Sequence, residues 1–114
     1  MREYDTMFSP PMDIYETEGE VVIELELPEV DISNVRIVQE GNRITIEGVK
    51  GYNVGNKKVR FLRMERYCGY FKRVVDLPFS PRQEDIKAVM GKGVLKIRIA
   101  KEKRIIEVEG EKDE

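Results

Sequence analysis

The residue best suited to nucleophilic chemistry is Cys68, the only cysteine in a chain that contains no histidine. A thiol becomes a nucleophile when a nearby cation lowers its pKa and a base orients it. Arg66 and Arg73 lie near Cys68 in the sequence, but no base does. The sequence therefore favours the alternative, in which Cys68 is a small apolar residue at the start of a strand.

The lack of histidine also removes the commonest general base and the usual member of a catalytic triad. A zinc site of the usual cysteine and histidine type cannot be assembled. The carboxylates are spread over polar strand faces and show no spacing typical of a catalytic pair. We expect no catalytic residues, no metal site and no cofactor, although a sandwich that binds a metal through carboxylates stays an alternative.

A glycine-rich motif, Gly-Lys-Gly at 91–93, fails as a dinucleotide-binding fingerprint because Lys96 stands at the position of the third glycine and no helix follows. Its two glycines instead predict a chain reversal between strands at 86–90 and 94–99. The second strand alternates with period two, which separates a buried face from a wet one carrying Lys96 and Arg98. The residues on the buried face are Leu95, Ile97 and Ile99.

Length and charge limit the class of protein. The chain has 114 residues, of which 20 are Lys or Arg and 22 are Asp or Glu, so the net charge is only −2. One domain with no strong electrostatic field is expected, and neither nucleic acid nor a membrane is an expected partner. No apolar run approaches the roughly 20 residues of a membrane span, and the first residues lead into no signal-type core. We therefore expect a cytoplasmic protein.

Several further segments read as short strands. The clearest is 21–27, where Val21, Ile23, Leu25 and Leu27 share one face and glutamates occupy the other. An edge strand is expected at 12–18, a tight hairpin turn at 40–43 and the longest loop at 48–58. The remaining expected strands are 35–38, 44–47, 59–66 and 69–78.

Helix is almost absent from this pattern. Only one helical turn is predicted, over 81–86, with Ser80 as its N-cap and Pro81 at its first position. Many short strands with so little helix favour an all-β fold, an antiparallel β-sandwich. The sandwich is expected over 12–100, between a short flexible arm at 1–11 and a highly charged extension at 101–114.

One strand carries an anomaly. Arg73 shares the expected inward face of the strand 69–78 with Phe71, Val75 and Leu77. An inward guanidinium needs a carboxylate or carbonyl partner, because an unpaired buried charge costs several kcal/mol. The alternative is an edge arginine whose head reaches water.

The order of these pieces resembles the small heat-shock protein family in its prokaryotic and archaeal form, whose shared unit is the alpha-crystallin domain. The likeness runs from about Met12 to Val108, and Glu29 departs from it, since a glycine usually follows the Leu-Pro pair. The residues that carry it are Met12-Asp13-Ile14-Tyr15-Glu16, Glu26-Leu27-Pro28, Ile44-Thr45-Ile46-Glu47-Gly48, Glu65-Arg66, Gly69-Tyr70-Phe71-Lys72-Arg73, Leu77-Pro78, Ala88, Gly93-Val94-Leu95 and Ile106-Glu107-Val108.

The resemblance implies an immunoglobulin-like sandwich that forms homodimers and larger homo-oligomers and holds unfolding client proteins without ATP. It also implies that the strand at 59–64 is exchanged and pairs with 12–16 of the partner, by β-augmentation. The alternative is a strand paired within its own subunit. The interface residues implied are Tyr15, Val59, Phe61, Leu62, Glu65 and Arg73.

The carboxyl-terminal motif of the family is Ile-x-Ile or Ile-x-Val, matched here by Ile106 and Val108 and preceded by Ile105. Alternation puts Ile106 and Val108 on one side of an extended segment, as two adjacent pockets require. The resemblance implies a receiving groove on another subunit, between strands 35–38 and 86–90. Its expected lining is Val35, Ile37, Ala88, Met90 and Leu95.

Two alternatives remain open. Ile106 and Val108 would add an edge strand to their own sheet if the extension folds back. The chain would be a co-chaperone resembling the CS domain, or another non-enzymatic β-sandwich that binds proteins, if it recognises a dedicated partner instead of many clients. The CS domain normally lacks the Gly-Val-Leu hinge and the terminal apolar pair, both present here.

Overall fold

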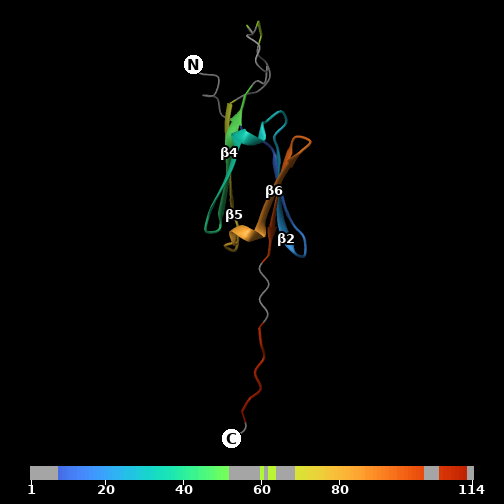
Figure 1. Ribbon diagram of the computed structural model, residues 1–114, viewed down its shortest axis with the longest axis vertical. Helices are drawn as coiled ribbons and strands as arrows, with labels where there is room; N and C mark the ends of the chain where they lie inside the picture. Colours follow the sequence, from blue (N-terminus) through green and yellow to red (C-terminus); the bar gives the residue numbers. More distant parts are fainter. Residues whose placement is uncertain (1–7, 52–59, 61, 64–68, 102–105, 113–114) are drawn as a thin grey trace.

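The computed structural model describes residues 8–51, 60, 62–63, 69–101 and 106–112. They form two antiparallel sheets, one in the order β1-β2-β7-β6 and the other in the order β3-β4-β5 (Figure 1). The all-β sandwich predicted from the alternating pattern is confirmed. The strands are β1 (Met12–Glu16), β2 (Glu20–Glu26), β3 (Val35–Glu40), β4 (Arg43–Lys50), β5 (Gly69–Asp76), β6 (Ile86–Gly91) and β7 (Val94–Ala100).

The core lies between the sheets and is built by alternation. The residues of β2 and β7 that were predicted to face inward are all buried, and β4 and β5 supply the opposite wall. Each fully buried aliphatic side chain stabilises the fold by about 1.5–3 kcal/mol relative to exposure. The core cluster is Val21, Ile23, Leu25, Leu27, Ile44, Ile46, Phe71, Val75, Leu77, Leu95, Ile97 and Ile99.

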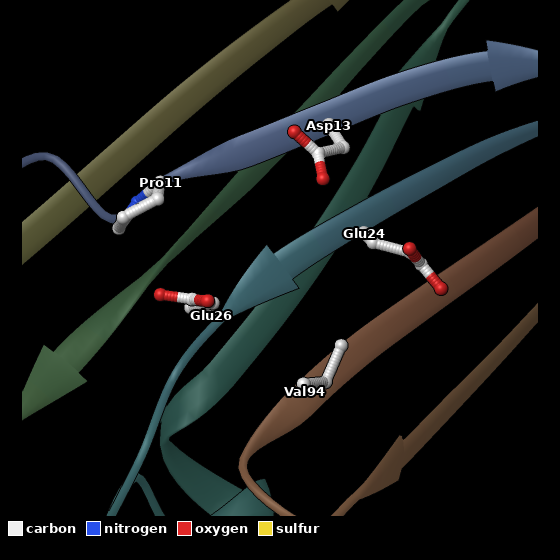
Figure 2. A pocket seen from close by; sticks show the side chains of 5 residues that line it. All are labelled: Pro11, Asp13, Glu24, Glu26 and Val94. Atoms are coloured by element: carbon white, nitrogen blue, oxygen red, sulfur yellow. The ribbon is translucent and has the colours of Figure 1, made fainter.

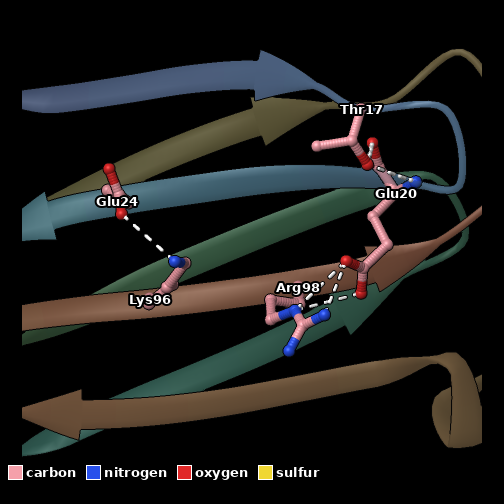
Figure 3. Close-up of polar contacts among 5 residues, drawn as sticks. All are labelled: Thr17, Glu20, Glu24, Lys96 and Arg98. Carbon is pink, nitrogen blue, oxygen red and sulfur yellow. Dashed lines mark hydrogen bonds and ion pairs between the residues drawn. The ribbon is translucent and has the colours of Figure 1, made fainter.

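The outer face of the four-stranded sheet carries ion pairs between β2 and β7 (Figure 3). Arg98 donates to both carboxylate oxygens of Glu20, with its Nη2 2.8 Å from Oε1, and Lys96 lies 3.7 Å from Glu24. The hydroxyl of Thr17 accepts the backbone N–H of Glu20 at 3.1 Å, which fixes the turn between β1 and β2. Exposed pairs of this kind each contribute about 0–1 kcal/mol.

Both tight hairpins occur where they were predicted, but one turns on a different residue. Gly41, with φ of 60°, reverses the chain between β3 and β4. Between β6 and β7 the reversal uses Lys92 and Gly93, with φ of 53° and 75°, whereas Gly91 belongs to β6. The predicted chain reversal at 91–93 is confirmed, but of the two glycines only Gly93 takes a left-handed φ, and Lys92 supplies the other left-handed residue.

The helical turn predicted over 81–86 occurs as a 3₁₀ turn, η3 (Gln83–Asp85), and its start differs from the prediction. Its N-cap position is Arg82, which makes no capping hydrogen bond with its side chain. The predicted start at Ser80 and Pro81 is wrong because Pro81 is buried and its carbonyl accepts a hydrogen bond from the side chain of Gln39. A second 3₁₀ turn, η2 (Ile32–Asn34), precedes β3 and was not predicted.

Residues 8–11, which we call the strap, are docked on the sandwich. The N–H of Phe8 donates to the Tyr70 carbonyl at 3.0 Å, and its ring lies 5.4 Å from that of Phe71. Pro10 is fully buried. For these four residues the expected flexible arm is wrong, because one aromatic and one proline side chain find apolar surface to cover; residues 1–7 lie outside the described residues.

Candidate partner-binding surfaces

The predicted groove residues lie on the edge strands of the two sheets, β3 and β6, or next to β6. Val35, Ile37 and Met90 are half-buried and pack against the core, so each keeps some apolar surface open to solvent. Ala88 is exposed although it lies on the same side of β6 as Met90. Leu95, which pairs with Met90 across the sheet, is only 4% exposed and therefore offers an occupant almost no surface in this conformation.

The carboxyl-terminal motif is fully presented to solvent. Ile106 is 82% exposed and Val108 is 93% exposed, and residues 106–112 belong to no strand. Figure 1 shows this segment leading away from the sandwich, beyond the end of β7. The alternative in which the pair extends its own sheet is therefore wrong for the described residues; Ile105 lies outside them.

The β1 edge is the second apolar surface. β1 is the outermost strand of its sheet, and it exposes Tyr15 by 40% and Ile14 by 49%. The two side chains lie on opposite faces of the strand, so each face of this edge exposes one apolar side chain to solvent. Tyr15 was predicted here, whereas Ile14 was missed although its alternation with Met12 could have indicated it.

The remaining predicted interface residues are only partly described. Leu62 is 94% exposed and belongs to no strand, like Arg60 and Arg63. Val59, Phe61 and Glu65 lie outside the described residues, and so does Cys68. The strand predicted over 59–66 is consequently not tested by this structure.

Arg73 contacts the strap. Its Nη1 donates to the carbonyl of Pro10 at 2.6 Å and to the hydroxyl of Ser9 at 3.3 Å. The partner that an inward guanidinium requires is therefore a backbone carbonyl of the same subunit. The sequence pattern identified the need for this partner but not the partner itself, since Pro10 is 63 residues away in the chain.

A shallow depression of about 180 Å³ lies on the outer face beside β1 and carries the carboxylates of Asp13, Glu24 and Glu26 (Figure 2). Asp13 and Glu24 are directly paired across the strands, and the Lys96 ammonium balances Glu24 from β7. In the part of the chain that the structure describes, no three histidine, cysteine or acidic side chains are placed to hold a metal ion. Within the same residues no helix is long and apolar enough to cross a membrane.

The fold with its apolar edges and exposed carboxyl-terminal pair defines an alpha-crystallin domain, and comparison with known families supports this assignment. Residues 13–113 match the Hsp20/alpha crystallin family. This protein therefore belongs to the small heat-shock protein family, which is not a family of enzymes. The family predicted from the ordered motifs is confirmed.

Individual relatives agree with this. The chain is 35% identical over 98 residues to small heat shock protein C4 of Rickettsia felis, covering 86% of this chain but 60% of that protein. It is 32% identical over 109 residues to the 19.0 kDa class II heat shock protein of rice, covering 89% of this chain and 62% of that one. Bacterial and plant proteins both match, so the matches do not single out a prokaryotic or archaeal type.

A solved structure shows the same fold. The small heat-shock protein from Xylella fastidiosa superposes with a TM-score of 0.73 at 27% identity, over 92% of this chain and 96% of that one. Together with the core described above, this establishes the immunoglobulin-like sandwich.

Proposed function

We propose that this protein is an ATP-independent holdase, which binds partly unfolded proteins and prevents their aggregation, and which assembles from homodimers into larger homo-oligomers. The observation that carries the proposal is the exposure of Ile106 and Val108 on a segment that leads away from its own sandwich. Two adjacent aliphatic side chains so exposed indicate a contact that is completed by another molecule. Family membership supports the chaperone activity.

Assembly beyond the dimer would use this carboxyl-terminal pair. Ile106 and Val108 would dock between β3 and β6 of another subunit, where Val35, Ile37 and Met90 keep part of their apolar surface open. Burying both side chains would contribute roughly 3–5 kcal/mol before ordering costs. A contact of this size is weak alone and becomes effective when it is repeated around an oligomer. The Xylella fastidiosa protein is described as having a distinct high order structure.

The dimer would form by strand exchange at the β1 edge. Residues 59–64 of one subunit would pair with Met12–Glu16 of the other, where an unpaired strand edge and the exposed Ile14 and Tyr15 are available. Backbone hydrogen bonds would give affinity, and the two apolar side chains would give register. The chaperone would act in the cytoplasm, a location compatible with a single cysteine that forms no internal disulfide.

A heat-aggregation assay tests the proposal. A model client protein is heated with and without this chain, and light scattering is followed in the presence and absence of ATP and of a chelator. The expected result is suppression that neither additive changes. Suppression abolished by the chelator would favour the metal-binding sandwich, and no suppression would favour the co-chaperone resembling the CS domain; either result would overturn the holdase.

A further inference from the structure

The strap connects the two sheets at one open rim of the sandwich. The backbone N–H of Phe8 donates a hydrogen bond to the carbonyl of Tyr70 on β5. Two residues later, the carbonyl of the buried Pro10 accepts a hydrogen bond from Arg73, which also lies on β5. The carbonyl of Pro11 then accepts the N–H of Glu26 at 3.0 Å, at the end of β2. The next residue begins β1. The entry of the chain into β1 is thus anchored from the three-stranded sheet and from the four-stranded sheet.

Arg73 makes the strongest of these anchors. It lies on the inner face of β5, level with Ile46 and Ile37 of the neighbouring strands. Its contact with the Pro10 carbonyl is a charge-assisted hydrogen bond, which is about twice as strong as a neutral one. Without it the partly buried carbonyl of Pro10 would lose its only described side-chain donor, and leaving such a carbonyl without a partner costs free energy.

β1 depends on this anchoring more than the inner strands β2 and β7 of its sheet do. β2 and β7 have a strand on both sides, whereas β1 is paired with β2 alone. An edge strand with one neighbour is among the first elements to open locally. A second copy of the chain binds more tightly to an edge that is already held extended. At a loose edge, the free energy needed to order the strand is subtracted from the free energy of binding.

We infer that Arg73 is a positioning residue that acts inside its own subunit: by holding Pro10 it fixes the strap, and through the strap it fixes β1 as the edge to which a second copy of this chain adds its strand. The inference rests on the proposed strand exchange. It differs from a contact between Arg73 and a carboxylate of the partner, which would stabilise the dimer without ordering β1.

The test combines hydrogen exchange with native mass measurement on the full chain, above and below the Kd of the wild-type dimer. Arg73→Gln is expected to raise exchange of the 12–16 amides about tenfold or more even when dilute, as the loss of one charge-assisted hydrogen bond predicts. The 94–100 amides, in β7, are expected to stay at wild-type rates. The Kd of the dimer should rise, and Arg73→Lys should restore most of both properties because an ammonium also donates to a carbonyl.

Two phenylalanine variants supply the matched comparison. Phe8 and Phe79 are both half-buried against the core, but only Phe8 belongs to the strap. Phe8→Ala should loosen 12–16 and raise the Kd like Arg73→Gln, and the double variant should add little, since both changes release the same segment. Phe79→Ala should lower overall stability without this selective effect on β1.

Several results would overturn the inference. One is hydrogen exchange of the 12–16 amides at the wild-type rate in dilute Arg73→Gln, together with a raised Kd of the dimer. This result would mean that Arg73 acts across the interface between subunits. Another is equal loosening of β1 by Phe79→Ala, which would show a general loss of stability. A wild-type chain that stays monomeric at every concentration would overturn the proposed strand exchange itself, whereas the exchange rates of 12–16 would still decide whether Arg73 holds the strap.

Discussion

The ring of Phe71 lies directly against the backbone of Gly48 on the neighbouring strand. A Cβ on Gly48 would come 2.8 Å from the Cζ atom of Phe71, and it would also meet the carbonyl oxygen of Asn34. The two residues are paired in register between β4 and β5, on the row that faces the core. The position of Phe71, which is fully buried, therefore depends on a residue with no side chain.

Gly48→Ala is expected to destabilise the fold by about 2–3 kcal/mol, the cost of forcing an extra carbon into a packed core. Chemical denaturation followed by circular dichroism measures the change. Gly19→Ala is the control, because a Cβ at Gly19 would meet nothing within 4 Å. Equal stability of the two variants would show that the Phe71 ring and the Asn34 backbone can both move aside without cost.

The inward-facing residues of β2 and β7 could be predicted one by one, because on this face of each strand apolar side chains recur at every second position of the sequence. The hairpin at Gly41 could be predicted for a similar reason, since the required left-handed conformation selects glycine. These features are local, so a single sequence contains the information that determines them.

Features that depend on distant neighbours could not be predicted. Val22 lies on the outer, charged face of β2 and is nevertheless buried, because the register places Tyr15 and Arg98 on either side of it. The acceptor for Arg73 was likewise unknown until the path of the strap was known. In both cases the deciding contact comes from residues that the fold, and not the local pattern, brings together.

A second prediction concerns Glu29, which adopts φ of 61° where the family resemblance expects a glycine. Left-handed backbone costs a residue with a Cβ about 1 kcal/mol or more. Glu29→Gly should therefore be more stable than Glu29→Ala by about 1 kcal/mol. The comparison is made between these two variants because both remove the contacts of the glutamate side chain; equal melting temperatures would contradict the backbone explanation.

A third prediction is a dependence of stability on pH through Asp76. A hydrogen bond and the charge of Arg43, whose Nε lies 2.9 Å from Oδ1, lower the pKa of Asp76 below its ordinary value of 3.8. Since the pKa is lower in the folded than in the unfolded chain, this pair stabilises the fold above the unfolded pKa and loses that effect as the pH falls through the folded value. Asp76→Asn should thus be less stable than wild type at pH 7, and the difference should shrink below pH 3.8.

Urea denaturation of both proteins across this pH range measures the effect of Asp76. Arg43→Gln should give the same convergence, because it removes the other member of the pair. A difference between wild type and Asp76→Asn that stays constant down to acid pH would mean that the carboxylate acts through something other than its ionisation.

The last prediction tests the carboxyl-terminal pair. Replacing Ile106 and Val108 together by alanine should reduce large assemblies to dimers, because the apolar surface that would be buried between β3 and β6 of a neighbour is lost while the sandwich and β1 are untouched. Native mass measurement and light scattering report the size.

Glu107→Gln is the matched control, since this residue lies between the two and its side chain points to the opposite side of an extended segment. It should keep the wild-type size, and so should Met90→Leu, which conserves the volume on the receiving side, whereas Met90→Asp should reduce the assembly as the double alanine variant does. If the double variant instead kept the full wild-type size, subunits would be joined by some surface other than this pair.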